Sequence, residues 1–228
     1  FCMSQTYNGI PWMSLFIHIV VLFFAIILHE VAHGYVAYLC GDPTAKNAGR
    51  LTLNPLAHIN PFGSIILPAL CVILGWPGFG YAEPVPYNPN NLRHRRLDEV
   101  LVALAGPASN LLQASVAAII YRVVFAVAKS NPSWAMAHAN LLVAWVIPIL
   151  STIMVSNIVL AVFNLIPLPP LDGSKLLLLF LPDNLRRKFY TIEPYCMIGL
   201  MILLWFDPGI INGIIDGSMS FLLKLLIG

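Results

Sequence analysis

Residues 12–33, WMSLFIHIVVLFFAIILHEVAH, decide the fold class of this 228-residue chain. Residues 12–28 form an apolar run that only Ser14 and His18 interrupt. The run approaches the length of about 20 residues that a helix needs to cross the hydrocarbon core of a bilayer. It ends directly on the ionisable stretch HEVAH at 29–33. A charged side chain at the centre of a membrane helix costs about 2.5–3.5 kcal/mol, so such groups usually have a function. The stretch therefore predicts a membrane helix that carries a functional site.

The composition of the whole chain agrees with a membrane protein. The chain is 59% hydrophobic and 10% charged, whereas a soluble domain has about 25% charged residues. Apolar segments cover roughly 12–39, 62–75, 99–128, 139–166, 195–206 and, after a break at 207–209, the stretch to Ile227. The first, third and fourth are long enough to span a bilayer as helices, and the others are short spans, re-entrant pieces or interfacial helices. We expect an all-α polytopic membrane protein with four to six transmembrane helices, in a single domain over residues 1–228, with short extended or re-entrant segments near the functional site.

The basic residues predict how the chain is oriented. They gather in the loops after the first and fourth segments and before the third, at Lys46, Arg50, Arg93, Arg95, Arg96, Arg186, Arg187 and Lys188. The connection between the third and fourth segments has only Lys129, with Arg122 near the helix end. Because loops rich in Lys and Arg stay in the cytoplasm, the basic loops should be cytoplasmic and the first helix should start outside. Segment 62–75 must then return to the side it left or not cross at all. Nucleic acid is not an expected partner, because the basic residues lie in short loops rather than on a solvated face.

The spacing H-E-x-x-H at 29–33 is typical of zinc hydrolases. Residues four apart in a helix lie on one face, so His29 and His33 can bind one zinc ion. Glu30 lies about 100° round the helix and can reach a water molecule as a general base. Zinc lowers the pKa of such a water to about 7. The alternative is that these three polar residues merely mark the end of the helix. In that case nothing would compensate the free-energy cost of placing them at the edge of a membrane helix.

A catalytic zinc ion needs a third protein ligand and an open fourth position. The favoured candidate is Asp172, in NLIPLPPLDG at 164–173, where three prolines unwind the end of a helix. Broken membrane helices line sites rather than face lipid. Asp172 could also cap the stretch 173–181, and the two roles are compatible. The second candidate is His58, in the loop after the first segment. No CxxC pair is present, so a thiolate site is not indicated.

Two asparagines are candidates for substrate binding. Asn110 ends the small-residue stretch AGPASN, and Asn164 precedes the proline break. Each could donate a hydrogen bond to a peptide carbonyl in the transition state or hold the substrate backbone. The alternative for both is hydrogen bonding between helices. For Asn157 the structural role is favoured, and His18 is expected to be a packed or interfacial histidine.

With these residues identified, the chain resembles the site-2 protease family of intramembrane zinc metalloproteases. The shared features are HEVAH at 29–33, AGPASN at 105–110 and NLIPLPPLDG at 164–173, in the family's order. The stretches at 49–63 and 82–93 look like those of a small bacterial or archaeal subgroup without a PDZ insertion or regulatory domain. The resemblance implies a site nearer the cytoplasmic face of the cell membrane. It also implies the role of each site residue: zinc ligands His29, His33 and Asp172, catalytic base Glu30, and substrate-binding residues Asn110 and Asn164.

The expected activity is that of a zinc-dependent endopeptidase with one Zn2+ per chain, which cleaves transmembrane segments of membrane-anchored proteins with metal-activated water. The expected partners are a transmembrane protein or peptide substrate and the lipid bilayer, and the sequence does not predict an oligomeric state. The extended stretches 47–60 and 80–91 could pair with an unwound substrate. One alternative is a metal-binding membrane transporter or receptor without hydrolytic activity, which needs no base. Another is a membrane zinc protease of a different type, which cuts soluble or lipidated tails and takes a glutamate on a helix as third ligand. It is disfavoured because Glu83, Glu99 and Glu193 lie in loops or at segment ends.

Overall fold

The structure is a computed structural model, and it describes residues 11–58, 66, 84–206 and 209–228. In these residues every regular element is helical. The main helices are α1 (Pro11–Leu39), α4 (Arg95–Ser130), α7 (Ile147–Leu165), α8 (Asp183–Phe206) and α9 (Gly209–Ile227). Three helical stretches are long and apolar enough to cross a membrane, namely Met13–Leu39, Arg95–Ser130 and Ala139–Leu165. The all-α membrane fold predicted from the sequence is confirmed.

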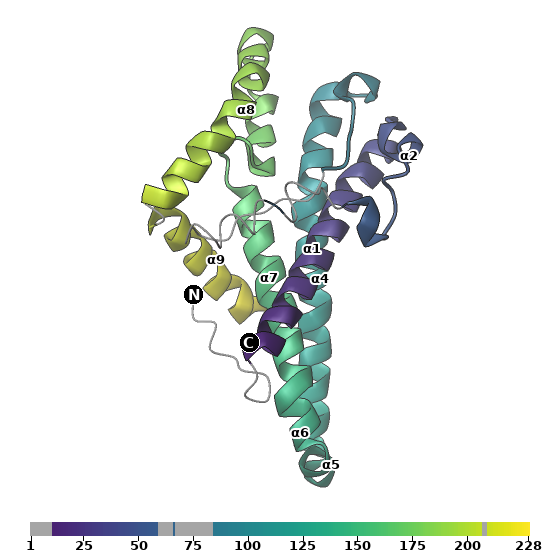
Figure 1. Cartoon of the computed structure of the whole chain (residues 1–228), viewed down its shortest axis with the longest axis vertical. Helices are drawn as coiled ribbons and strands as arrows, with labels where there is room; N and C mark the ends of the chain where they lie inside the picture. Colours follow the sequence, from purple (N-terminus) through teal and green to yellow (C-terminus); the bar gives the residue numbers. More distant parts are fainter. Residues whose placement is uncertain (1–10, 59–65, 67–83, 207–208) are drawn as a thin grey trace.

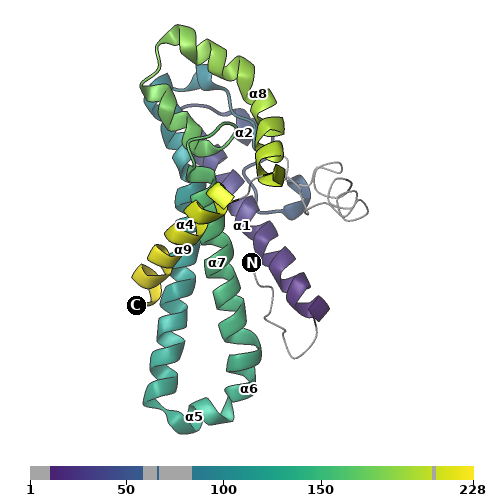
Figure 2. The same ribbon diagram turned by 90° about the vertical axis from the view of Figure 1, so that its left-hand side faces the viewer.

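Helices α4 and α7 run side by side and form the long axis of the molecule, with α1 crossing them (Figure 1). The two views agree that α9 slants across this pair (Figure 2). Small side chains let the helices approach: Ala117 and Ala118 of α4 pack against Leu150 and Met154 of α7. Such small residues are what membrane helices use at close contacts. The core therefore lies along the interface between α4 and α7, called the α4–α7 seam below. Helix α1 packs against this seam at residues 29–33.

The fourth apolar segment is a continuous helix with a change of winding. It consists of α6 (Ala139–Leu141), the π-helical turn η5 (Leu142–Val146) and α7, in whose first turn Pro148 lies. Proline has no N–H to donate and its ring crowds the carbonyl four residues earlier. A single π turn before the proline accommodates this crowding. The short helix α5 (Pro132–Ala137) joins α4 to this segment at the lower end (Figure 1).

Asp42, fully buried after the end of α1, ties that end to the segment before α4. Its carboxylate accepts hydrogen bonds from the backbone N–H of Thr44 (3.1 Å) and of Asn88 (2.6 Å), and from the Asn91 side chain (2.8 Å). The short helices α2 (Thr44–Asn47), η2 (Pro55–Ala57) and η4 (Pro89–Asn91) complete this region. The connection between α1 and α4 thus starts and finishes at the same end of the molecule.

Three predicted segments differ from the structure or lie beyond it. The apolar stretch 195–206 is only the second half of α8, because its first half is amphipathic and carries the charges of Asp183, Arg186, Arg187 and Lys188. Neither α8 nor α9 is among the candidate spans of the described residues. Segment 62–75 lies outside the described residues except for Ile66. Within 84–91, the expected extended backbone holds up to the short helix η4, but the described part of the stretch 47–60, also expected to be extended, contains the end of α2 and the short helix η2.

Candidate metal centre

Three side chains from two separate elements converge beside the α4–α7 seam. His29 and His33 lie one turn apart on α1, and Asp172 is the first residue of the 3-10 helix η6 (Asp172–Leu179). The two Nε2 atoms are 3.0 Å apart. Asp172 Oδ2 lies 3.1 Å from His29 Nε2 and 3.4 Å from His33 Nε2. Among the described residues this is the one group of three or more His, Cys, Asp or Glu side chains close enough to hold a metal ion.

The geometry of this group fits zinc. Tetrahedral bonds of 2.0–2.1 Å place neighbouring ligand atoms about 3.3 Å apart, and the three observed separations are 3.0, 3.1 and 3.4 Å. Asp172 Oδ2 is buried and has no well-formed hydrogen bond within the described part of the chain. A buried carboxylate oxygen without such a bond is expected where it serves a metal ion instead. Two imidazoles and one carboxylate are also a common ligand set of catalytic zinc.

Helix α4 fixes the orientation of both imidazoles. His29 Nδ1 lies 2.6 Å from Asn110 Oδ1, and His33 Nδ1 lies 2.6 Å from the backbone carbonyl of Val102. Because both partners are acceptors, each Nδ1 carries the proton and each Nε2 keeps its lone pair. Hydrogen bonds of this kind hold metal-binding histidines in the correct tautomer and orientation. Both lone pairs point toward Asp172.

Asn110 is fully buried and uses its polar atoms within the protein. Beyond its bond with His29, its Nδ2 donates to Asn157 Oδ1 (2.8 Å) and to the carbonyl of Ala25 (3.3 Å). Asn157 Nδ2 in turn donates to the carbonyl of Ile153 (2.9 Å). These contacts favour a positioning role for Asn110 over the substrate contact predicted from the sequence. They give Asn157 the structural role expected of it.

Gly106 keeps space free beside the three ligand atoms. A Cβ at this position of α4 would overlap His33 Nε2 and the Cε1 and Nε2 atoms of His29. Only glycine leaves this space open. The AGPASN stretch was noted in the sequence for Asn110, but nothing in it indicated that Gly106 belongs to the site.

Glu30 is held by a segment that precedes α4. Its Oε2 accepts a hydrogen bond from the backbone N–H of Val85 (3.0 Å). Val85 is buried against α1, where a Cβ on Gly34 would lie 2.6 Å from Val85 Cγ1. Nothing in the sequence indicated this contact, because a backbone N–H has no sequence signature. The extended segment that Asp42 anchors therefore also orients Glu30, the predicted base.

Asn164 is half-buried at the end of α7. Its Nδ2 donates to the carbonyl of Leu160 (3.0 Å) within its own helix. Its role in substrate binding stays a prediction.

The structure argues against the alternative third ligands. His58 is outside the metal-binding group, and its Nε2 lies 2.8 Å from the carbonyl of Thr52. Glu99 pairs with Arg186 at 2.7 Å and Glu193 pairs with Lys175 at 2.5 Å. Glu83 lies outside the described residues. Asp172 does not cap η6 either: the cap position is Leu171, and no side-chain cap bond is formed.

Comparison with known proteins is consistent with this site. Residues 17–206 match the family model of Peptidase family M50, the site-2 protease family. The chain is 37% identical to "Putative zinc metalloprotease YwhC" of Bacillus subtilis over 186 residues, which cover 81% of this chain and 78% of that protein. It is 30% identical to "Putative zinc metalloprotease Rip2" of Mycolicibacterium smegmatis over 203 residues, 88% of this chain and 71% of that protein. No solved structure matches the chain. The chain belongs to peptidase family M50, and it is a membrane zinc metalloendopeptidase of the site-2 protease type.

Proposed function

We propose that this protein is an intramembrane endopeptidase that cleaves transmembrane segments of membrane-anchored proteins. The observation that carries the proposal is that the ligand group lies on helices long and apolar enough to cross a membrane: His29 and His33 belong to the candidate span Met13–Leu39, and Val102 and Asn110 belong to the candidate span Arg95–Ser130. A peptide bond must therefore reach a point within a membrane helix to meet the site. A protease acting only on soluble chains has no need of such a position.

We assign the zinc ligands to His29, His33 and Asp172, and the general base to Glu30. A zinc ion held by these residues would supply Lewis-acid chemistry: it would polarise a carbonyl oxygen and lower the pKa of water toward neutrality. Glu30 would accept a proton from water and later deliver it to the leaving amine. We also assign to Asn164, which lies at the broken end of α7, the role of holding the substrate backbone.

The substrate must be locally unwound before hydrolysis, because a helix keeps its carbonyls in internal hydrogen bonds. Segment 84–88 is extended and lies against Glu30 through Val85. An extended edge beside the site can pair with an unwound peptide as an added strand. We therefore assign substrate alignment to this segment.

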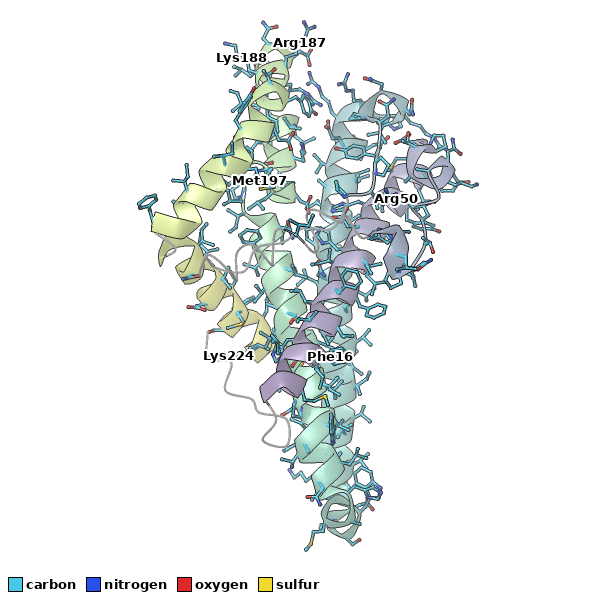
Figure 3. The ribbon with its side chains drawn as sticks, viewed as in Figure 1. Phe16, Arg50, Arg187, Lys188, Met197 and Lys224 are labelled. Carbon is cyan, nitrogen blue, oxygen red and sulfur yellow. The ribbon has the colours of Figure 1, made fainter. Side chains whose placement is uncertain are left out.

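The distribution of charge supports a multi-pass orientation with the site nearer the cytoplasm of the cell membrane. Arg187 and Lys188 lie at the upper end of the molecule, and Arg50 lies on the same upper half (Figure 3). The lower end has Lys129 and Arg122 of α4. Loops rich in Lys and Arg remain cytoplasmic, so α1 and the α6–α7 segment run toward the cytoplasm and α4 runs away from it.

The test is cleavage of single-pass peptides by the full chain in liposomes. We compare the wild type, Glu30→Gln, chelator-treated wild type and, as a matched carboxylate control, Asp216→Asn at an exposed position of α9. Loss of a general base slows a reaction by about 10²–10⁴-fold, so Glu30→Gln and chelation should each abolish measurable cleavage, and the control should cleave normally. Cleavage that survives both treatments would remove the proteolytic proposal. A transporter or receptor would cleave no peptide and would keep its metal binding in Glu30→Gln.

A further inference from the structure

A cavity rich in arginine lies between the start of α4 and the start of α8, away from the metal centre. Its volume is about 340 Å3, and it is lined by Arg95, Arg96, Asp183, Arg186, Arg187 and Tyr190. We call it the arginine cavity. It lies at the basic upper end of the molecule, where Figure 3 shows Arg187 at the tip of α8.

Positive charge in the arginine cavity exceeds negative charge. Asp183 accepts one hydrogen bond from Arg96 (2.7 Å). Arg186 is already paired with buried Glu99 (2.7 Å) and donates to the carbonyl of Leu178 (3.0 Å). Arg95 and Arg187 form no ion pair with any carboxylate in the part of the chain that the structure describes. The guanidinium groups of Arg95 and Arg187 are thus available to bind an anion from outside the chain.

The backbone adds to this positive potential. Helix α4 begins at Arg95 and helix α8 begins at Asp183, so the N-terminal ends of two long helices meet at the cavity. Each end carries a partial positive charge and N–H groups without helical acceptors. The local field also acts on Asp183: the hydrogen bond from Arg96 and the charges of Arg96, Arg186 and Arg187 lower the pKa of its carboxyl. Like charges gathered in this way repel one another, and a bound anion offsets the repulsion.

Phosphate is the anion that these groups fit. Guanidinium groups bind phosphate through two parallel hydrogen bonds, and helix N-termini are ready-made phosphate sites. At the cytoplasmic surface of a membrane the abundant phosphates belong to anionic lipids, and basic pockets between membrane helices bind their headgroups. We propose that the arginine cavity binds a phosphate group, supplied by the headgroup of an anionic phospholipid.

A phosphate in this cavity would stabilise the part of the fold that carries Asp172. Arg186 joins three elements, because it contacts Glu99 of α4 and the Leu178 carbonyl of η6 from its own position on α8. The Tyr190 hydroxyl donates to the same Glu99. Asp172 begins η6. An anion bridging Arg95 and Arg187 would hold the starts of α4 and α8 together around this junction.

The test measures lipid binding by the full chain and does not depend on proteolysis. Thermal melting in neutral detergent is followed while phosphatidylglycerol, phosphatidylcholine, or inorganic phosphate at matched ionic strength is added. The variant is Arg95→Gln/Arg187→Gln. The matched control is Lys129→Gln/Lys188→Gln, which removes the same two charges at exposed positions outside the cavity.

We expect phosphatidylglycerol to raise the melting temperature of the wild type and of the control. Because the arginine variant loses two cationic groups that would contact the phosphate, it should bind this lipid at least about tenfold more weakly than the wild type. If only inorganic phosphate stabilised the wild type, and the arginine variant lost this effect, the cavity would still be a phosphate site, but its ligand would be a soluble phosphate. Equal binding by variant and control would overturn the proposal. Should the glutamine variant not fold, Arg95→Lys/Arg187→Lys keeps the charge and loses the paired hydrogen bonds, and unchanged binding in it would equally count against the site.

Discussion

At the residue scale, the metal centre depends on the absence of a side chain at position 106. Gly106 lies on α4 directly beside His29 and His33, and any Cβ there would enter the space around their Nε2 atoms. Alanine is the best helix former and is favoured over glycine by about 1 kcal/mol in a helix interior. The helix alone would therefore prefer alanine at this position, and the site explains why glycine stands there.

We expect Gly106→Ala to lose zinc. The added methyl group would push the two imidazoles away from the arrangement that suits the ion, and cleavage should disappear with the metal. Zinc per chain, measured by elemental analysis after purification, should fall from about one toward zero. The control is Gly199→Ala on α8, where a Cβ would meet nothing within 4 Å. If Gly106→Ala retained a full complement of zinc, the close approach of α4 to the ligands would not matter as we infer.

The residues differ in how far the sequence predicted them. The spacing of His29 and His33, and the proline-rich approach to Asp172, predicted the three ligands because their side chains carry the chemistry. The contacts of Val85 with Glu30 and of Val102 with His33 were not predictable, because backbone groups leave no pattern in the sequence. Asn110 was identified as important, but only the structure shows that its oxygen faces His29.

At the element scale, long apolar runs fixed the predicted helices well. The segments expected at 12–39 and 99–128 correspond to Pro11–Leu39 and Arg95–Ser130. Helix α8 was expected to begin at 195 and begins at Asp183, because an amphipathic helix at a membrane surface shows no continuous apolar run. The π turn before Pro148 was also not predicted. A proline in the sequence indicates that the helix is disturbed there, but not which kind of turn results.

The link between α1 and the segment before α4 gives a prediction about pH. Burial works against ionisation of Asp42, but hydrogen bonds from Thr44, Asn91 and Asn88 outweigh it and lower the pKa of the Asp42 carboxyl. The folded state therefore holds the proton less tightly than the unfolded state, in which the pKa of Asp is about 3.9. The ionised carboxylate stabilises the fold at neutral pH, and this contribution is lost as the pH falls below about 4 and through the folded pKa.

We expect Asp42→Asn to destabilise the protein by about 2 kcal/mol near neutral pH, the scale of a buried hydrogen bond to a charged group. The substitution keeps the shape and removes the charge and one acceptor. Melting temperatures of variant and wild type should converge as the pH falls below about 4 and through the folded pKa of Asp42, where the wild-type carboxyl takes up its proton. Asp216→Asn, at an exposed position of α9, is the control and should have little effect over the same range. If the difference in melting temperature between Asp42→Asn and wild type stayed constant as the pH was lowered, the ionised carboxylate would not be its cause.

At the scale of the whole molecule, the metal centre joins parts of the chain that are far apart in sequence. In our assignment α1 supplies two ligands and η6 the third, while α4 lies behind both imidazoles through Val102 and Asn110. The chain between His33 and Asp172 includes α4 and α7, so these side chains are brought together only when most of the fold has formed. An ion that binds this arrangement therefore binds the folded state and adds its binding free energy to the stability of the fold.

Removal of zinc should therefore lower the stability of the whole molecule and not only its activity. A ligand that binds the folded state alone adds about 2.7 kcal/mol at a free concentration one hundred times its Kd. Chelation should lower the melting temperature of the wild type in detergent, and readdition of zinc should restore it. Asp172→Asn removes the anionic ligand, so its melting temperature should respond little to either treatment, whereas Asp216→Asn should respond as the wild type does. A wild-type melting curve that did not respond to the chelator would mean that the ion does not join α1 to η6.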